Sequence, residues 1–177
     1  MILTAAAAFG AVDQYIGSLY SQFATAVSVM SAPWLLLPFA AGAFQVSWRR
    51  AAWLGLASTW LAVAGYVLMI DSPMEGVHLT PQVLAATTYS QWIWFAGGAV
   101  SGPAYAAAGY FWRAHRSWLC AALATLPVLL EPAVHGLGLR PSPDPAAGYA
   151  EMAAGLALAA IFAGLIARAR RTAAVEP

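Results

Sequence analysis

Seven of the eight arginines in this 177-residue chain lie in three short clusters, and each cluster follows a pair of long apolar stretches. The clusters are Arg49 with Arg50, Arg113 with Arg116, and Arg168 with Arg170 and Arg171. Arginine and lysine are enriched in the short cytoplasmic loops of membrane proteins. If all three clusters face the cytoplasm, the chain crosses the bilayer an even number of times between them. The clusters therefore predict a multi-span topology before any motif is considered.

Composition supports a membrane protein with a single domain over residues 1–177. The chain is 62% hydrophobic and only 8% charged, whereas a soluble domain is about 25% charged. The net charge of +1 gives no indication of a nucleic-acid partner. The only cysteine, Cys120, excludes an internal disulfide and a cysteine-based metal site. The N-terminus lacks a basic leader region, so we interpret it as the start of a spanning helix and not as a cleaved signal peptide.

Six apolar stretches are long enough to be spanning helices, which need about 20 mostly apolar residues. They are residues 2–20, 23–46, 51–70, 89–112, 118–137 and 149–167. A polar stretch from Asp71 to Thr88 and a Pro-rich segment from Arg140 to Pro145 connect spans at the opposite end from the arginine clusters. With both termini in the cytoplasm, all three clusters lie inside. The expected fold is an all-α bundle of six transmembrane helices.

Small residues and prolines inside the predicted spans indicate how the helices pack. Glycines at helix-packing spacing, which allow backbones to approach closely in lipid, are Gly55, Gly97, Gly98, Gly102 and Gly109. Prolines that each remove a backbone donor and can kink a helix are Pro33, Pro38, Pro103, Pro127 and Pro132. Kinks open space between helices, so we expect a bundle that is not solidly filled.

Two acids lie within predicted spans, Asp13 and Glu131, and ionisable residues at such depth are candidates for function. Glu131 and His135 are four residues apart, which places them on one helical face. Removal from water favours the neutral carboxyl group, a competent proton donor, whereas a charged His135 would oppose this. The alternative is that Glu131 hydrogen-bonds a neighbouring helix or meets water near the interface.

Asp13 must face a partner helix or a cavity, and the alternative to function is a structural hydrogen bond between helices. Asp71 and Glu75 flank Pro73 and Gly76, which indicates loop solvation or helix termination. They remain candidate acids at the outer end, where they could cap a cavity.

Most tryptophans and tyrosines fit the aromatic belts at the two membrane interfaces. Six are candidates for the wall of a substrate pocket: Trp34, Trp60, Tyr66, Trp92, Trp94 and Tyr105. Trp92 and Trp94 are two residues apart and point in different directions on a helix, so we expect at most one of them to face the pocket. For each aromatic residue the alternative is packing or lipid contact.

Common cofactor and metal signatures are absent from the sequence. It contains no Gly-rich phosphate loop and no His-Glu-x-x-His motif. An Asp-rich cluster of the kind that binds diphosphate through magnesium is also missing. We therefore expect neither a metal nor a cofactor, and no substrate that is activated by loss of diphosphate.

A family resemblance rests on four features: Trp48-Arg49-Arg50 after an apolar hairpin, Gly65-Tyr66 closing a span, Gly98-x-x-x-Gly102-Pro103, and Glu131. This pattern resembles small multi-span proteins of the bacterial inner membrane, which include membrane-bound terpene cyclases of indole-sesquiterpenoid and other meroterpenoid pathways. The resemblance implies a proton-initiated (class II) cyclisation, in which a buried acid protonates an epoxide or alkene of a prenylated substrate. It implies Glu131 as the donor, assisted by His135. Asp13 would share that role or stabilise charge, and deep aromatic side chains would shield the carbocations.

Two other functions remain open. A proton-coupled transporter would use Asp13 and Glu131 as relay carboxylates. A non-catalytic membrane protein would pair these acids with other helices in a filled bundle. The sequence leaves the oligomeric state open as well. In each case the expected partner is the lipid bilayer, and for the first two an apolar or small-molecule substrate.

Overall fold

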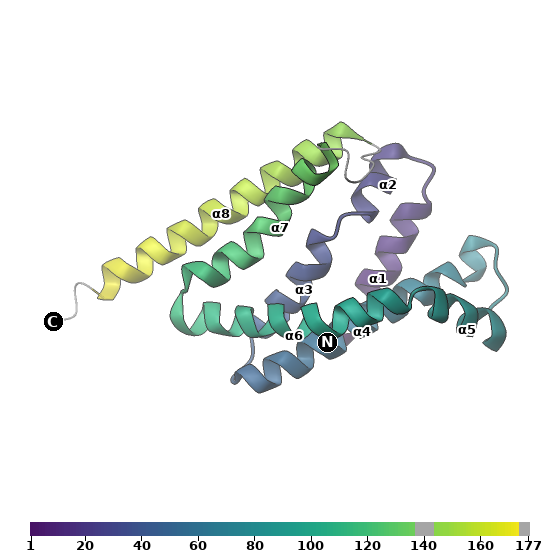
Figure 1. The fold of residues 1–177 in the computed structure, drawn as a ribbon, viewed down its shortest axis with the longest axis horizontal. Helices are drawn as coiled ribbons and strands as arrows, with labels where there is room; N and C mark the ends of the chain where they lie inside the picture. Colours follow the sequence, from purple (N-terminus) through teal and green to yellow (C-terminus); the bar gives the residue numbers. More distant parts are fainter. Residues whose placement is uncertain (137–143, 174–177) are drawn as a thin grey trace.

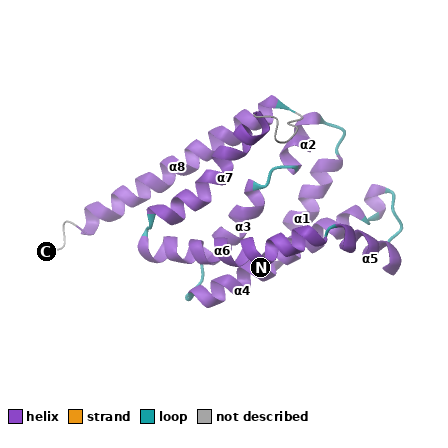
Figure 2. Cartoon of the chain, in the orientation of Figure 1, coloured by secondary structure: helices purple, strands orange, loops and turns teal. Residues whose placement is uncertain are grey.

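The computed structural model of the chain describes residues 1–136 and 144–173, with residues 135, 136 and 173 described by their backbone alone. This part of the chain is all-helical and contains no strand (Figure 2). The elements are α1 (Ile2–Ser18), α2 (Gln22–Ser28), α3 (Ala32–Ala43), α4 (Trp48–Ile70), the 3-10 turn η1 (Pro73–Glu75), α5 (Pro81–Ser90), α6 (Trp92–His115), α7 (Trp118–Gly136) and α8 (Pro145–Ala173).

Helix α4 is the centre of the main packing unit. It packs most extensively on α6 and α1, and α3 packs on both α6 and α4. The last two helices, α7 and α8, pack mainly on each other as a long hairpin along one side of this unit (Figure 1). The chain thus has a four-helix core of α1, α3, α4 and α6, beside which the α7–α8 hairpin lies.

Glycines set the helix crossings of the core. Each crossing uses one glycine from each helix: Gly10 and Gly65 for α1 with α4, Gly55 and Gly102 for α4 with α6, and Gly42 and Gly109 for α3 with α6. At each position an added Cβ would overlap backbone atoms of the opposite helix. Close backbone approach of this kind is how helices associate in lipid, where the surrounding chains are as apolar as the side chains.

Four of the five glycines that the sequence marked for packing do pack closely. Gly55, Gly102 and Gly109 lie at the crossings above, and an added Cβ on Gly98 would lie 2.7 Å from the Thr59 methyl group. Gly97 differs, because nothing lies within 4 Å of a Cβ placed there. The packing prediction is therefore confirmed at four positions and wrong at Gly97, which faces open space.

Aromatic side chains join the hairpin to the core at one end. The ring of Phe162, from α8, lies 4.5 Å from the ring centroid of Trp112 on α6 and 6.0 Å from that of Phe39 on α3. All three side chains are buried, together with Ala121 and Ala124 of α7. Edge-to-face ring pairs at these distances are favourable arrangements, so this cluster is the main apolar contact between the two units.

Two helices among the described residues are long and apolar enough to cross a membrane, namely α4 and the Pro145–Thr172 part of α8. A third candidate is the α2–α3 pair, if the two helices count as one span bent by 45°. The apolar part of α7, Trp118–Val134, is shorter. The all-helical fold class is confirmed, whereas six spans and the cytoplasmic placement of both termini stay predictions.

The expected second span, residues 23–46, is not one helix. It is broken between α2 and α3, and α3 ends at Ala43. Pro33 lies in the first turn of α3, where its missing N–H is harmless. In a continuous helix the same ring would clash with the carbonyl four residues earlier. The helix therefore restarts at Ala32, and the backbone of Met30 and Ser31 lies outside any helix.

Other helix boundaries also differ from the expected ones. Helix α5 lies mostly in the polar stretch, Asp71 to Thr88, that was expected to connect two spans. It starts with Pro81, and its N-cap Thr80 accepts a hydrogen bond from the Val83 N–H at 3.2 Å. Helix α4 begins at Trp48, which precedes the expected residue 51, and α8 runs from Pro145 to Ala173, well beyond the expected 149–167. Polar caps and arginines extend these helices past their apolar segments.

The three arginine clusters lie at the same end of the molecule, at the start of α4, the end of α6 and the end of α8 (left in Figure 1). Arg113 Nη1 donates a hydrogen bond to the carbonyl of Ala43, at the end of α3, with a distance of 3.2 Å. This shared position is the arrangement that the positive-inside argument requires. Which side of a membrane this end faces stays a prediction.

Candidate functional site

A partly open cavity of about 560 Å³ lies within the four-helix core. Its wall comes from α1, the α2–α3 break, α3, α4 and α6, and it is mostly apolar. Small-molecule sites in proteins are concave, mostly apolar and of about 300–1,000 Å³, with a few placed polar groups. This cavity has the size and character of such a site.

Asp13 is the one carboxyl residue in the wall among the described residues. It lies on α1 and is 8% exposed, and its Oδ2 accepts a hydrogen bond from Trp34 Nε1 at 3.3 Å. The bond joins α1 to α3, as the structural alternative expected, and the carboxyl group also borders the cavity. Asp13 therefore fits both interpretations, a structural hydrogen bond between helices and a carboxyl group available at a cavity.

Aromatic rings surround this carboxyl group. The Trp34 ring lies edge-on to Phe9 at 5.2 Å and to Tyr66 at 6.0 Å, which holds its indole between α1 and α4. Trp34, Tyr66 and Trp94 all line the cavity. Of Trp92 and Trp94, only Trp94 is in the wall, as the two-residue spacing predicted.

The α2–α3 break forms a rim of the cavity that contains two serine side chains. The lining residues of this rim are Ser28, Val29, Met30 and Ser31. The Ser28 hydroxyl donates a hydrogen bond to the Thr25 carbonyl at 3.0 Å. Non-helical backbone at membrane depth is tolerated where it lines a cavity or is buried in protein. On the opposite side, Gly97 of α6 leaves room in the wall.

Glu131 holds the α2–α3 break from outside the cavity wall. Its Oε1 accepts the N–H of Ser31 at 2.7 Å and its Oε2 accepts the N–H of Ala32 at 3.0 Å. These donors belong to the start of α3, where backbone N–H groups lack helical partners and negative charge is favoured. Both oxygens are therefore engaged as acceptors, which suits a carboxylate. This is the alternative in which Glu131 hydrogen-bonds a neighbouring helix.

Glu151 of α8 is a second acid at this place, and the sequence interpretation missed it. It is 7% exposed, and its carboxyl group lies close to that of Glu131. The Oε1 of Glu151 is buried without a partner among the described residues. The spacing gave a signal in the sequence, because Ala147, Glu151 and Gly155 recur every four residues and so share one helical face. The structure shows that all three are buried.

The other candidate acids lie away from the cavity. Asp71 ends α4 and is 2% exposed, with its Oδ1 accepting from Thr87 Oγ1 at 2.8 Å and its Oδ2 buried without a partner among the described residues. Helix termination is thus confirmed for Asp71, and solvation is wrong, because α5 covers this position. Glu75 has one buried oxygen, Oε1, that lacks a hydrogen-bond partner in the described part of the chain. The side chain of His135 lies outside the described residues.

Three of the six aromatic candidates are not in the cavity wall. Trp60 donates its indole N–H to the Phe95 carbonyl at 3.0 Å, and Trp92 is 58% exposed at the start of α6. Tyr105 packs against the Phe39–Trp112–Phe162 cluster. The structure therefore does not bring these three rings together with Asp13, and their role in substrate binding stays a prediction.

No group of three or more His, Cys, Asp or Glu residues that could hold a metal ion occurs in the described part of the chain. The described wall of the cavity offers one carboxyl group, three aromatic side chains and the hydroxyl groups of the rim and of α4 and α6. Such a set can donate a proton, accept one back and stabilise positive charge.

Comparison with known proteins identifies the family of this chain but adds no information on what the cavity binds or does. No curated protein matches it, and no solved structure matches it. The sequence profile of a family described as a family of unknown function, DUF6518, matches residues 1–176. The match covers nearly the whole chain, and the protein therefore belongs to the DUF6518 family.

Proposed function

We propose that this protein is an integral membrane terpene cyclase that binds a prenylated, epoxidised substrate in the core cavity and starts its cyclisation by protonation from Asp13. The observation that carries the proposal is a mostly apolar cavity of about 560 Å³ with a single carboxyl group in its described wall. An apolar cavity suits a prenyl chain and limits the access of water, which would quench carbocations.

Asp13, in place of Glu131, takes the role of the acid in this proposal. Glu131 uses both oxygens to accept backbone N–H groups at the start of α3, an arrangement that suits a structural cap better than a proton donor. Among the described residues, Asp13 accepts one hydrogen bond, on Oδ2. A buried carboxyl group without a cationic partner is favoured in its neutral form, which is the form that donates.

The reaction balances without a co-reactant. The Asp13 proton passes to the epoxide oxygen, the C–O bond breaks with its electron pair on oxygen, and a hydroxyl group forms. The carbon cation then takes the π electrons of the neighbouring alkene, which closes the ring. Loss of a proton from the last cation to the Asp13 carboxylate completes an isomerisation and restores the acid.

Aromatic rings supply the second requirement, stabilisation of positive charge. Ring faces of tryptophan and tyrosine attract cations by about 0.5–2 kcal/mol each, most strongly away from water. Trp34, Tyr66 and Trp94 line the cavity, and two of them form a continuous edge-to-face series with Phe9. The acid and the rings therefore border the same space.

Asp13→Asn tests the proposal. We expect membranes that contain this variant to convert an epoxidised farnesyl indole at least 100-fold more slowly than wild type, because positioned acids contribute about 10²–10⁴-fold. Asp144→Asn is the matched control, since Asp144 caps the start of α8 away from the cavity and should leave turnover unchanged. Unchanged product formation by folded Asp13→Asn would exclude Asp13 as the acid.

A second candidate function, a proton-coupled carrier, is favoured by one observation. The α2 and α3 helices meet at an angle of 45° beside the cavity, and broken helices at a central site are a mark of secondary transporters. Flux of substrate driven by a proton gradient in proteoliposomes, without chemical change of that substrate, would favour the carrier over the cyclase.

A further inference from the structure

A second pocket, of about 420 Å³, lies at the arginine-rich end, between the α6–α7 turn and the end of α8. Its wall includes Arg116, Arg170 and His115, with Trp118 and Ile166 on its apolar side. Asp and Glu are absent from its described wall. The described wall of the core cavity contains a carboxyl group and no arginine, so the two spaces differ in the charge of their described walls.

Arg116 is held in place by its backbone and by an aromatic ring. It ends α6 with φ of 49° and ψ of 38°, and among the described residues it is the one non-glycine with positive φ. This conformation is uncommon for a side chain of this size. Its N–H donates to the Trp112 carbonyl at 2.8 Å, and its guanidinium carbon lies 5.1 Å from the centroid of the Trp112 ring. The guanidinium group is therefore held in place, because the Trp112 ring beneath it is itself part of the buried cluster.

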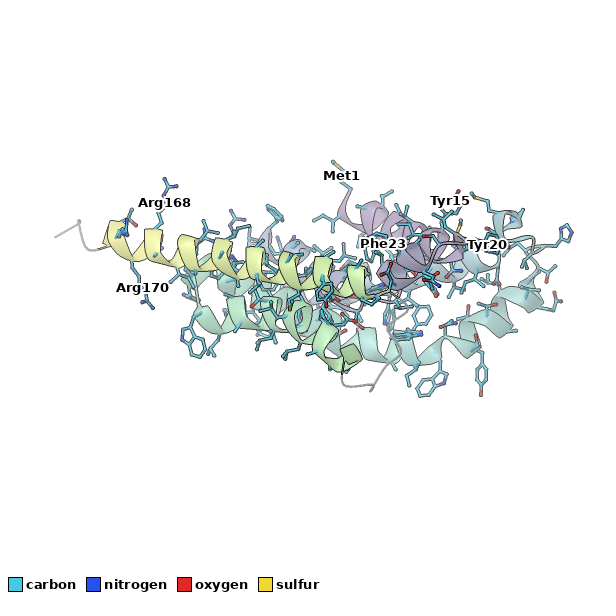
Figure 3. All side chains as sticks on the ribbon, turned by 90° about the horizontal axis from the view of Figure 1, so that it is seen from above. Met1, Tyr15, Tyr20, Phe23, Arg168 and Arg170 are labelled. Atoms are coloured by element: carbon cyan, nitrogen blue, oxygen red, sulfur yellow. The ribbon has the colours of Figure 1, made fainter. Side chains whose placement is uncertain are left out.

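Arg170 reaches the same pocket from α8. Arg168 and Arg170 project from opposite sides of this helix (Figure 3), and only Arg170 belongs to the pocket wall. Arg171 is exposed and is also outside the wall. Two residues of the same cluster thus face elsewhere, although the sequence predicts the same cytoplasmic position for all three.

Helix ends do not neutralise the two guanidinium groups. The ends of α6 and α8 each contribute about half a negative charge, and the start of α7 contributes about half a positive charge in the same region. Their sum, about half a negative charge, is too small to neutralise two full positive charges around a pocket without a described carboxylate. An anion is the missing partner, and arginine pairs most strongly with phosphate and carboxylate oxygens.

We propose that this pocket binds the phosphate group of an anionic phospholipid. The apolar side explains why the anion should carry an acyl chain: Trp118 is 62% exposed, and it stands beside Ile166 at the pocket. Basic pockets between helices on the cytoplasmic side suit lipid headgroups. The site is independent of the core cavity and of the reaction proposed there.

The experiment uses the full-length protein in detergent and follows its thermal unfolding as lipid is added, because a ligand that binds the folded state stabilises it. Phosphatidylglycerol is compared with phosphatidylcholine and with inorganic phosphate alone. We expect stabilisation by phosphatidylglycerol that needs at least tenfold more lipid in the Arg116→Gln, Arg170→Gln double variant. The Arg168→Gln, Arg171→Gln double variant removes the same charge outside the pocket and should titrate as wild type does.

Each outcome decides the proposal. Equal loss in the two double variants would mean that general positive charge attracts the lipid, and would overturn a defined pocket. Equal stabilisation by phosphatidylcholine would overturn the requirement for an anion. Stabilisation by inorganic phosphate alone, with the same dependence on Arg116 and Arg170, would support a phosphate site and overturn its assignment to lipid. The measured quantity is the lipid-dependent shift, so a variant that is less stable without lipid remains informative.

Discussion

The four-helix core and the α7–α8 hairpin are held together in different ways. In the core, α1, α3, α4 and α6 meet backbone to backbone at paired glycines. The hairpin is attached by side chains, chiefly the Phe162 ring at one end and the Glu131 carboxylate at the other. The wall of the core cavity includes no described residue of α7 or α8.

This difference separates the two acids that the sequence places within predicted spans, Asp13 and Glu131. Asp13 lies on a core helix and borders the cavity, whereas Glu131 lies on the hairpin and caps α3. Backbone contacts at glycine admit no additional atom, so the shape of the cavity is fixed by the core itself. The hairpin then acts on the cavity through the α2–α3 break, whose Ser31 both lines the cavity and donates to Glu131.

The largest effect is expected from a bulky residue at a core crossing. In Gly42→Leu the new side chain would occupy the position of the Ala106 backbone. Overpacking usually costs about 1–3 kcal/mol, and we expect about 5 kcal/mol here because backbone cannot rotate away. The measurement is thermal unfolding in detergent, with the yield of folded protein as a second readout.

Gly164→Leu is the matched control for this change. Gly164 lies on α8, and nothing lies within 4 Å of a Cβ placed there, so we expect its unfolding temperature to stay close to that of wild type. Similar destabilisation by both substitutions would mean that glycine itself, by its effect on helix formation, and not close packing, explains the result.

The second prediction concerns the polar attachment of the hairpin. Glu131→Ala leaves the N–H groups of Ser31 and Ala32 without this acceptor, and hydrogen bonds to charged groups contribute about 1.5–3 kcal/mol. We expect a loss of about 3 kcal/mol, with faster amide hydrogen exchange at the start of α3. Glu131→Gln keeps one acceptor oxygen and should lose about half as much. Unchanged exchange at Ser31 and Ala32 in Glu131→Ala would show that the cap is not needed.

The third prediction concerns the apolar attachment. Phe162→Ala removes the ring that packs on Trp112 and Phe39. In water-soluble cores Phe→Ala costs about 3–5 kcal/mol, but in lipid the gain from leaving water is absent. We therefore expect about 2 kcal/mol, from lost packing alone. Hydrogen exchange should increase in α7 and α8 and stay unchanged in α1 and α4. An equal increase in hydrogen exchange in both units would contradict the inference that the core is held together without the hairpin.

Sequence reasoning predicted the all-helical fold and the glycine contacts because both depend on local pattern. Runs of apolar residues indicate buried or lipid-facing helices, and glycines at Gly55, Gly102 and Gly109 indicate close approach. The sequence predicted only part of the change in helix direction at Pro33. A proline in an apolar run predicts a kink, but a full break needs an acceptor for the freed N–H groups, and Glu131 is about 100 residues distant in sequence.

The candidate site was predicted less completely because it depends on helix rotation. Asp13, Trp34, Tyr66 and Trp94 meet at the cavity, while Trp60, Trp92 and Tyr105 turn elsewhere. The rotation of each helix about its axis follows from which glycine meets which backbone, and one sequence does not specify those partners. Glu151 was missed for a related reason, since its burial depends on the helix face that it shares with Ala147 and Gly155.

The smallest effect is expected at an exposed contact within the core. Arg113 Nη1 donates to the Ala43 carbonyl at 3.2 Å, which joins the ends of α6 and α3. Both groups remain accessible to water, so a replacement partner is available, and we expect Arg113→Gln to lower the free energy of unfolding by only about 0.5 kcal/mol. The paired crossing of Gly42 and Gly109 already joins these two helices. A loss above about 2 kcal/mol would mean that the core, like the hairpin, depends on a side-chain attachment, and the contrast between the two units would not hold.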